Sequence, residues 1–283
     1  MNWKQTLFWS FSTAAIFYYF LLFGVFVFVG QEEMQLFIPE WWYIREFLFQ
    51  PGGFCAVAGQ WILQYYRQPM SAVVLHTVLL VGCGFMVYRI LRCFSDKTYL
   101  LFLSLLPVLY LVKMSIHGEY LVDGTVGVVL MLLALSVSLK VRRAGSIAGY
   151  GIASTLFLCG LTGLLSVCYA FLYTLLALLR YKTSRQRLAA AACLIPALFI
   201  YLFSGWLGIP VPLSDGWMPE AYLEIQRLPH YYMYRVWTFF TLSIVGVALF
   251  ARFVPVIGEK SKWMDRVAPV SYTHLTLPTT PYV

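Results

Sequence analysis

Long apolar runs alternate with short charged or polar segments along the chain. The first run, Leu7–Val29, holds 23 residues without a charge. As an α-helix rising about 1.5 Å per residue it spans roughly 34 Å, enough to cross a bilayer. Five further runs are predominantly apolar: Met70–Leu91, Tyr99–Val112, Val126–Leu139, Leu188–Leu207 and Val236–Val254, with Arg89 and Arg252 near the ends of the first and the last. The pattern predicts an all-α fold, a polytopic transmembrane helical bundle.

One apolar segment allows two interpretations. Ile147–Leu179 has 33 uncharged residues between two basic clusters. A single long, tilted helix would place those clusters on opposite sides of the membrane. A hairpin turning near Gly160–Gly163 would keep both on one side, as positive clusters usually are, and brings the total to about eight spans. The spacing of Gly145 and Gly149 also predicts a close helix contact.

The longest segment that is neither a span nor a short turn is Gly30–Gln68. It is rich in aromatic residues and breaks once, at Pro51-Gly52-Gly53. After the break, Val57, Trp61 and Tyr65 recur every four residues, which is the spacing of one helix face. We therefore expect interfacial amphipathic helices in this first outer loop.

Composition and charge agree with a membrane protein. The chain is 61% hydrophobic and 11% charged, whereas soluble domains carry about 25% charged residues. The net charge of +8 does not indicate nucleic-acid binding, because the basic residues lie in clusters between the apolar runs. With the N-terminus inside, 15 of the 20 Lys and Arg residues fall on the inner side. This split predicts a multi-pass inner-membrane protein with a cytoplasmic N-terminus.

The C-terminal segment is expected to be foreign to the fold. Residues 270–279, VSYTHLTLPT, resemble the translation of a sequencing-adapter sequence in one reading frame. We therefore expect residues 269–283 to be a non-native tail. Residues 1–268 are then a transmembrane domain and the N-terminal fragment of a longer protein.

Glu32 and Glu33 are the first candidate catalytic residues. They are adjacent carboxylates directly after the first apolar run. At that depth a carboxylate can act as a general base on a hydroxyl near the lipid surface. The alternative is that the pair only ends the helix in the headgroup region.

The same loop holds candidate substrate-binding residues. Arg45 and Arg67 can pair with the phosphate of a lipid headgroup, and Trp42 and Trp61 can lie beside it in the interface. A plain aromatic belt at the membrane surface is the alternative reading of the tryptophans.

A third group lies between two later spans. His117, Glu119 and Asp123 could contact a ligand together, or could form only a polar connection. Their spacing matches no metal-ligand pattern, and the six cysteines contain no CxxC pair. We expect no metal and no cofactor. His76, inside the second span, is an intramembrane ionisable residue and therefore a functional suspect.

Two resemblances add to this reading. The stretch REFLFQPGGF, Arg45 to Phe54, resembles an uncharacterised family of multi-pass membrane proteins from Bacteroidales-type bacteria. The layout is also similar to that of C-type membrane glycosyltransferases, in which an acidic residue opening the first outer loop is the base. That similarity implies the role for Glu32 or Glu33. The chain departs from that family in having Gln-Glu-Glu in place of an Asp-containing pair, and in lacking an outer DxD motif.

The leading functional expectation follows from this similarity. It is transfer of a sugar from a polyprenyl-linked donor on the outer face, with membrane lipid as the surrounding partner. The alternative is a non-enzymatic membrane protein, either a transporter or an assembly partner.

Overall fold

The computed structural model describes residues 3–34, 37–95, 97–117, 120–203 and 228–260, and every regular element in these ranges is a helix. In chain order they are α1 (Trp3–Phe23), α2 (Val25–Met34), α3 (Trp41–Leu48), α4 (Gly53–Leu63), the 3-10 helix η1 (Gln64–Arg67), α5 (Pro69–Leu91), α6 (Leu100–Met114), α7 (Val122–Ser138), α8 (Ala144–Thr162), α9 (Leu165–Arg180), α10 (Ser184–Ala191), α11 (Leu194–Leu202) and α13 (Leu228–Lys260).

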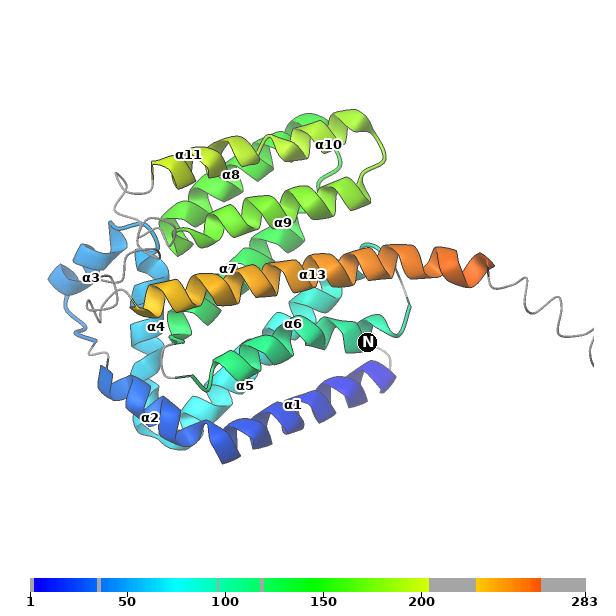
Figure 1. The fold of residues 1–283 in the computed structure, drawn as a ribbon. Coiled ribbons are helices and arrows are strands. Elements are labelled where there is room, and N and C mark those ends of the chain that lie inside the picture. The colour runs from blue at the N-terminus through cyan, green and yellow to red at the C-terminus, as the bar shows by residue number, and fades with distance from the viewer. Residues whose placement is uncertain (1–2, 35–36, 96, 118–119, 204–227, 261–283) are drawn as a thin grey trace, which may run out of the picture.

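The long helices lie side by side, and α2, α3 and α4 gather at one end of the bundle (Figure 1). We call this the cap end. The opposite end holds the first residues of α1 (Figure 1). We call it the basic end because of the Lys and Arg side chains there. Within the bundle, α5 packs against α1, α6 and α7.

The apolar helices coincide with the predicted runs. Five are long and apolar enough to cross a membrane: α1, α5, α8, the combined α10–α11 (Ser184–Leu202), and Val236–Phe253 within α13. Three more, α6, α7 and α9, are apolar but have only 15, 17 and 16 residues. A full crossing needs about 20. The all-α, membrane-type architecture is confirmed, with five helices of spanning length among the described residues.

Large apolar side chains face outward along the bundle. Phe11 on α1 is 74% exposed, Phe26 on α2 is 89% exposed and Ile195 on α11 is 71% exposed. Exposed apolar surface on this scale is unfavourable in water and is what lipid tails cover. The fold is that of an integral membrane protein.

The first apolar run is not one straight helix. It bends at Gly24, where α1 ends and α2 begins in a new direction (Figure 1). A Cβ added at Gly24 would lie 2.8 Å from the ring of Phe28 and 2.9 Å from the Phe20 carbonyl oxygen. The missing side chain therefore leaves room for the Phe28 ring and the Phe20 carbonyl at the bend. The helix also continues to Met34, so Glu32 lies on α2. The prediction from the sequence that Glu32 lies in a loop is wrong.

The predicted break at Pro51-Gly52-Gly53 is confirmed and separates α3 from α4. Gly52 has φ 85°, a left-handed conformation that costs a side-chain-bearing residue free energy. A Cβ on Gly53 would lie 1.7 Å from the carbonyl oxygen of Phe47. Both glycines are required by this turn.

Ile147–Leu179 forms the favoured hairpin. Helices α8 and α9 pack on each other, and the chain reverses at Gly163, which has φ 61°. The turn lies against the break in the first loop, because Gly52 donates a backbone hydrogen bond to the Gly160 carbonyl, 3.1 Å away. The two glycine turns thus fasten the cap to the bundle.

The predicted close contact at Gly145 and Gly149 is wrong. A Cβ at either position would meet nothing within 4 Å. The close approach on α8 occurs instead at Gly151, where a Cβ would lie 3.1 Å from Cys193 and from Tyr173. The glycine that packs is therefore Gly151, two residues after Gly149, and it faces α9 and the connection between α10 and α11.

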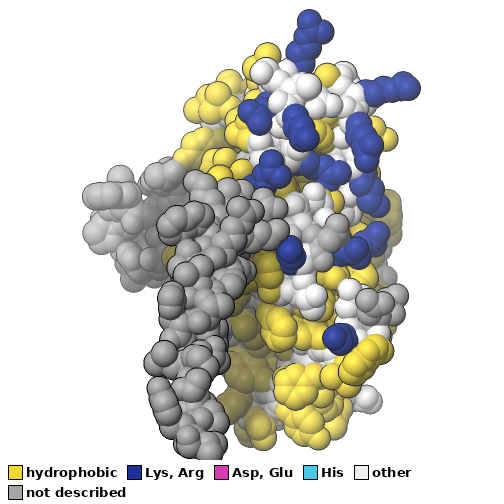
Figure 2. Space-filling model, turned by 90° about the vertical axis from the view of Figure 1, so that its right-hand side faces the viewer, with side chains coloured by type: hydrophobic (Ala, Val, Ile, Leu, Met, Phe, Trp, Pro, Cys, Tyr) yellow, Lys and Arg dark blue, Asp and Glu magenta, His cyan; other side chains and the backbone are white. Residues whose placement is uncertain are grey.

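The two ends of the bundle differ in charge. Lys and Arg side chains cover the basic end, and no Asp or Glu side chain is visible among the described residues on that face (Figure 2). The described acidic side chains belong to the cap end: Glu32, Glu40, Glu46 and Asp123.

Candidate functional site

The cap end brings α2 against the connection between α6 and α7. Gln31 is buried, and its Nε2 donates to the Tyr120 carbonyl at 2.8 Å and to the His117 carbonyl at 3.5 Å. Glu32, the next residue, is partly buried. Two of the predicted catalytic residues, Glu32 and His117, therefore lie on segments that contact each other at the cap end. The side chain of Glu33 and all of Glu119 lie outside the described residues.

Asp123 lies beneath α4, in the first turn of α7. A Cβ added at Gly59 would be 2.7 Å from the Asp123 Cβ, so no side chain fits between the backbones of α4 and α7 at this crossing. The carboxylate oxygen Oδ1 accepts a hydrogen bond from the Gly124 N–H at 2.6 Å. Burial, and then the charge of Asp123, raise the pKa of the neighbouring Cys55 thiol to about 12. Asp123 thus belongs to the joint between cap and bundle.

Helix α3 folds back along α4. The Tyr43 hydroxyl donates to Gln60 Oε1 at 3.1 Å, and Gln64 Nε2 donates to the Phe37 carbonyl at 3.2 Å. Arg45 lies two residues after Tyr43, roughly 200° further round the helix, so it faces away from α4. Its guanidinium carbon lies 5.8 Å from the centre of the Phe49 ring.

The structure does not bring the two predicted arginines together. Arg67 ends η1 and is exposed, on a different element from Arg45. Helix α2 packs against η1, so Arg67 lies near the helix that carries Glu32. Trp42 is exposed and donates from Nε1 to Glu40 at 2.7 Å. Of the four predicted binding residues, Trp42 and Arg45 lie on α3, Trp61 lies on α4, and Arg67 lies on η1, which contacts α4.

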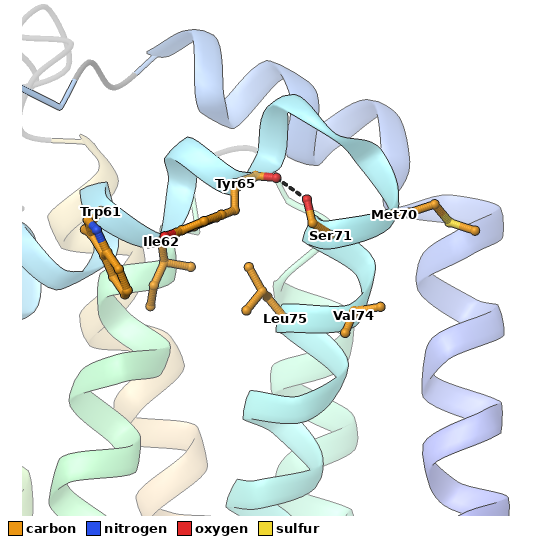
Figure 3. A pocket seen from close by; sticks show the side chains of 7 residues that line it. All are labelled: Trp61, Ile62, Tyr65, Met70, Ser71, Val74 and Leu75. Carbon is orange, nitrogen blue, oxygen red and sulfur yellow. Dashed lines mark hydrogen bonds between the residues drawn. The ribbon is translucent and has the colours of Figure 1, made fainter.

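Trp61 lines a groove of about 520 Å³ between α4 and α5 (Figure 3). The other lining residues are Ile62, Tyr65, Met70, Ser71, Val74 and Leu75. The only hydroxyl in the α5 part, that of Ser71, is turned to the Tyr65 carbonyl (Figure 3). The groove is therefore apolar. Arg67 lies in the chain between its two walls, at the end of η1.

Sequence reasoning found one wall of this groove and missed the other. The four-residue spacing of Trp61 and Tyr65 marked an amphipathic face. Met70 and Val74 have the same spacing at the start of α5 and are also exposed, but in an apolar span this spacing does not stand out.

A second polar group is enclosed near α2. The His76 ring stacks on Phe28 with centroids 4.2 Å apart, and the Tyr66 ring lies 5.3 Å away. Both His76 ring nitrogens and the Tyr66 hydroxyl are buried without a hydrogen-bond partner among the described residues. Burial raises the pKa of Tyr66, so this hydroxyl stays protonated. The group is enclosed by aromatic rings and has no opening to the groove.

Comparison of the sequence with known protein families places the chain in one of them. Residues 1–278 match the family described as "Family of unknown function (DUF6057)". The chain belongs to the DUF6057 family. No curated protein and no solved structure matches this DUF6057 chain. The match confirms an uncharacterised family, and it extends into the segment expected to be foreign, which lies outside the described residues.

No group of three or more His, Cys, Asp or Glu residues in the described part of this DUF6057 chain could hold a metal ion. What the cap end does offer is an apolar groove, an exposed cation on η1 between its two walls in the chain, and a partly buried carboxylate on α2, which packs against η1. This combination suits a ligand that has a long apolar part and an anionic head.

Proposed function

We propose that this protein crosses the inner membrane eight times, with a cytoplasmic N-terminus and the cap on the outer side. The positions of the basic residues support this orientation, because cations of membrane proteins concentrate on the cytoplasmic side. The short helices α6, α7 and α9 count as crossings in this proposal. Helix α4 covers the start of α7, so the end of this short helix is enclosed by protein, where non-spanning backbone is tolerated.

We further propose that the cap binds a phosphate-bearing lipid of the outer leaflet. The observation that carries this proposal is the apolar groove between α4 and α5, whose two walls are joined in the chain by η1, which ends at the exposed Arg67. Its volume lies within the range of about 300–1,000 Å³ typical of small-ligand sites. The lipid chain is already in hydrocarbon, so the groove holds it by packing against apolar side chains and not by removing it from water. Arg67 then pairs with the phosphate at the membrane surface.

The reaction that suits these groups best is glycosyl transfer from a polyprenyl-linked donor. Glu32 accepts the proton of an acceptor hydroxyl while the oxygen bonds to the anomeric carbon of the sugar. The bond from that carbon to the phosphate oxygen breaks, and the polyprenyl phosphate leaves with the electron pair. The position of Glu32 supports this role, since it lies on α2, which packs against η1 and α5 beside the groove.

The experiment uses the full chain reconstituted with a polyprenyl-phosphate sugar donor. Glu32→Gln should lower turnover by about 10²–10⁴, the usual cost of losing a general base, with donor binding retained. Arg67→Gln should mainly weaken donor binding. Arg45→Gln is the matched control, because Arg45 faces away from α4. Turnover at the parental rate in Glu32→Gln would remove the catalytic proposal.

A non-enzymatic role, as a transporter or assembly partner, is the second candidate. The enclosed His76 favours it, because an ionisable residue inside a span is a feature of transport pathways. Donor binding without turnover in every variant, including the parent chain, would support this candidate instead of the transferase.

A further inference from the structure

Two connections at the basic end are tied together by hydrogen bonds. The first, residues 139–143, joins α7 to α8; the second, residues 181–183, joins α9 to α10. The Tyr181 hydroxyl donates to the Val141 carbonyl at 2.7 Å, and Gln186 Nε2 donates to the Arg142 carbonyl at 2.7 Å. Arg187 Nε donates back to the Tyr181 carbonyl at 2.8 Å. We call residues 139–143 and 181–187 the basic loop pair.

The loop pair concentrates cations on a fixed backbone. Six Lys and Arg side chains on it are exposed: Lys140, Arg142, Arg143, Lys182, Arg185 and Arg187. Directly before it, Arg180 keeps Nη1 buried with no hydrogen-bond partner among the described residues. Figure 2 shows dark blue side chains gathered over this part of the basic end, with no acidic side chain described beside them.

Other cations at the same end have a different setting. Arg89 lies 6.0 Å from the centre of the Phe85 ring, and Arg92 lies 6.0 Å from that of Tyr88. These side chains lie along their own helix, α5, and on the connection that follows it. The loop pair differs in joining two separate connections and in directing six charges to solvent.

We propose that the basic loop pair binds the phosphate headgroup of an anionic membrane lipid, in the leaflet on the side of the N-terminus. The pair closes the ends of α7, α8, α9 and α10, so its side chains lie at headgroup depth. Clusters of Lys and Arg at the end of membrane helices attract anionic lipid headgroups. The short connections do not project far enough from the bundle to enclose a soluble partner. The site lies at the opposite end from the lipid groove and does not depend on it.

The test compares variants of equal charge in detergent-solubilised full-length chain. The ligands are cardiolipin, which carries two phosphates, phosphatidylcholine as the zwitterionic reference, and inorganic phosphate. Bound lipid is counted by native mass spectrometry. The triple variant Arg142→Gln, Arg143→Gln, Arg185→Gln should lose about tenfold or more in cardiolipin affinity. The matched triple variant Arg89→Gln, Arg92→Gln, Lys97→Gln removes the same charge from the same end and should retain parental affinity within about twofold.

A third variant separates geometry from charge. Gln186→Leu removes the hydrogen bond to Arg142 without changing a charge, and should weaken cardiolipin binding several-fold while the helical circular dichroism stays parental. An equal loss in both triple variants would mean a general basic surface and would overturn the proposal. Binding of inorganic phosphate as tight as that of cardiolipin, or parental binding in Gln186→Leu, would overturn it as well.

Discussion

Replacing Gly59 with alanine tests how the cap is held on the bundle. The new Cβ would lie 2.7, 2.8 and 2.9 Å from the Cβ, N and Cα atoms of Asp123. Two of these are backbone atoms, which cannot rotate away, so α4 and α7 must separate. Overpacking costs about 1–3 kcal/mol, and backbone contacts favour the upper part, about 2–3 kcal/mol. Alanine recovers about 0.5–1 kcal/mol in helix propensity.

The net loss in free energy of unfolding is therefore about 1–2.5 kcal/mol. At roughly 2–4 °C per kcal/mol for a chain of this size, the midpoint of thermal unfolding should fall by about 2–10 °C. The matched control is Gly82→Ala in α5, where a Cβ meets nothing within 4 Å. That variant should gain about 0.5–1 kcal/mol.

A local assay reads the same perturbation at Cys55. Its thiol has a pKa of about 12, so at pH 8 about one molecule in 10⁴ carries the reactive thiolate. Lifting α4 exposes the thiol, lowers its pKa toward about 8.5 and speeds maleimide labelling at least tenfold. Exposed Cys93 serves as the internal reference. Parental labelling of Cys55 together with an unchanged unfolding midpoint in Gly59→Ala would refute the packing argument.

Three further predictions concern stability in detergent, measured as the free energy of unfolding. Gly52→Ala should cost about 1–3 kcal/mol, because φ is 85° and the new Cβ would lie 3.3 Å from a backbone nitrogen; a parental value would contradict this. Gln31→Leu should cost about 1–3 kcal/mol, because it leaves the buried Tyr120 carbonyl unpaired; no loss would mean that α2 is not anchored there. His76→Leu should stay within about 1 kcal/mol of the parent, since its ring nitrogens have no hydrogen-bond partner to lose among the described residues, whereas Phe28→Ala should cost about 3–5 kcal/mol; equal losses would contradict this difference.

The local signals in the sequence identified the helices and the turns but not how they meet. The break at Pro51-Gly52-Gly53 and the reversal near Gly163 were each predicted from glycine and proline positions. Their contact was not, because a pattern of neighbouring residues carries no information on which distant turn packs against it. The hydrogen bond from Gly52 to Gly160 appears only in three dimensions.

The same limit explains the errors. Gly145, Gly149 and Gly151 are equally small, so the sequence alone does not show which of them faces a neighbour. At Gly24 the tight contacts are with the Phe28 ring and the Phe20 carbonyl oxygen, which only the folded chain brings together. The groove needs both α4 and the first two turns of α5, and only the α4 wall carries its aromatic residues outside an apolar span, where their spacing is visible.

The proposal that the groove between α4 and α5 binds a phosphate-bearing lipid is tested most directly by photo-crosslinking. The full chain, in membranes, is exposed to a polyprenyl phosphate with a photoreactive group near the head of its chain, and labelled residues are mapped by mass spectrometry. We predict labelling concentrated at the groove, on Trp61, Ile62, Met70 and Val74, and reduced about tenfold or more in Arg67→Gln, since a charge-assisted contact contributes about 1.5–3 kcal/mol. Equal labelling along the other lipid-facing helices, unchanged in Arg67→Gln, would contradict a lipid site at the cap.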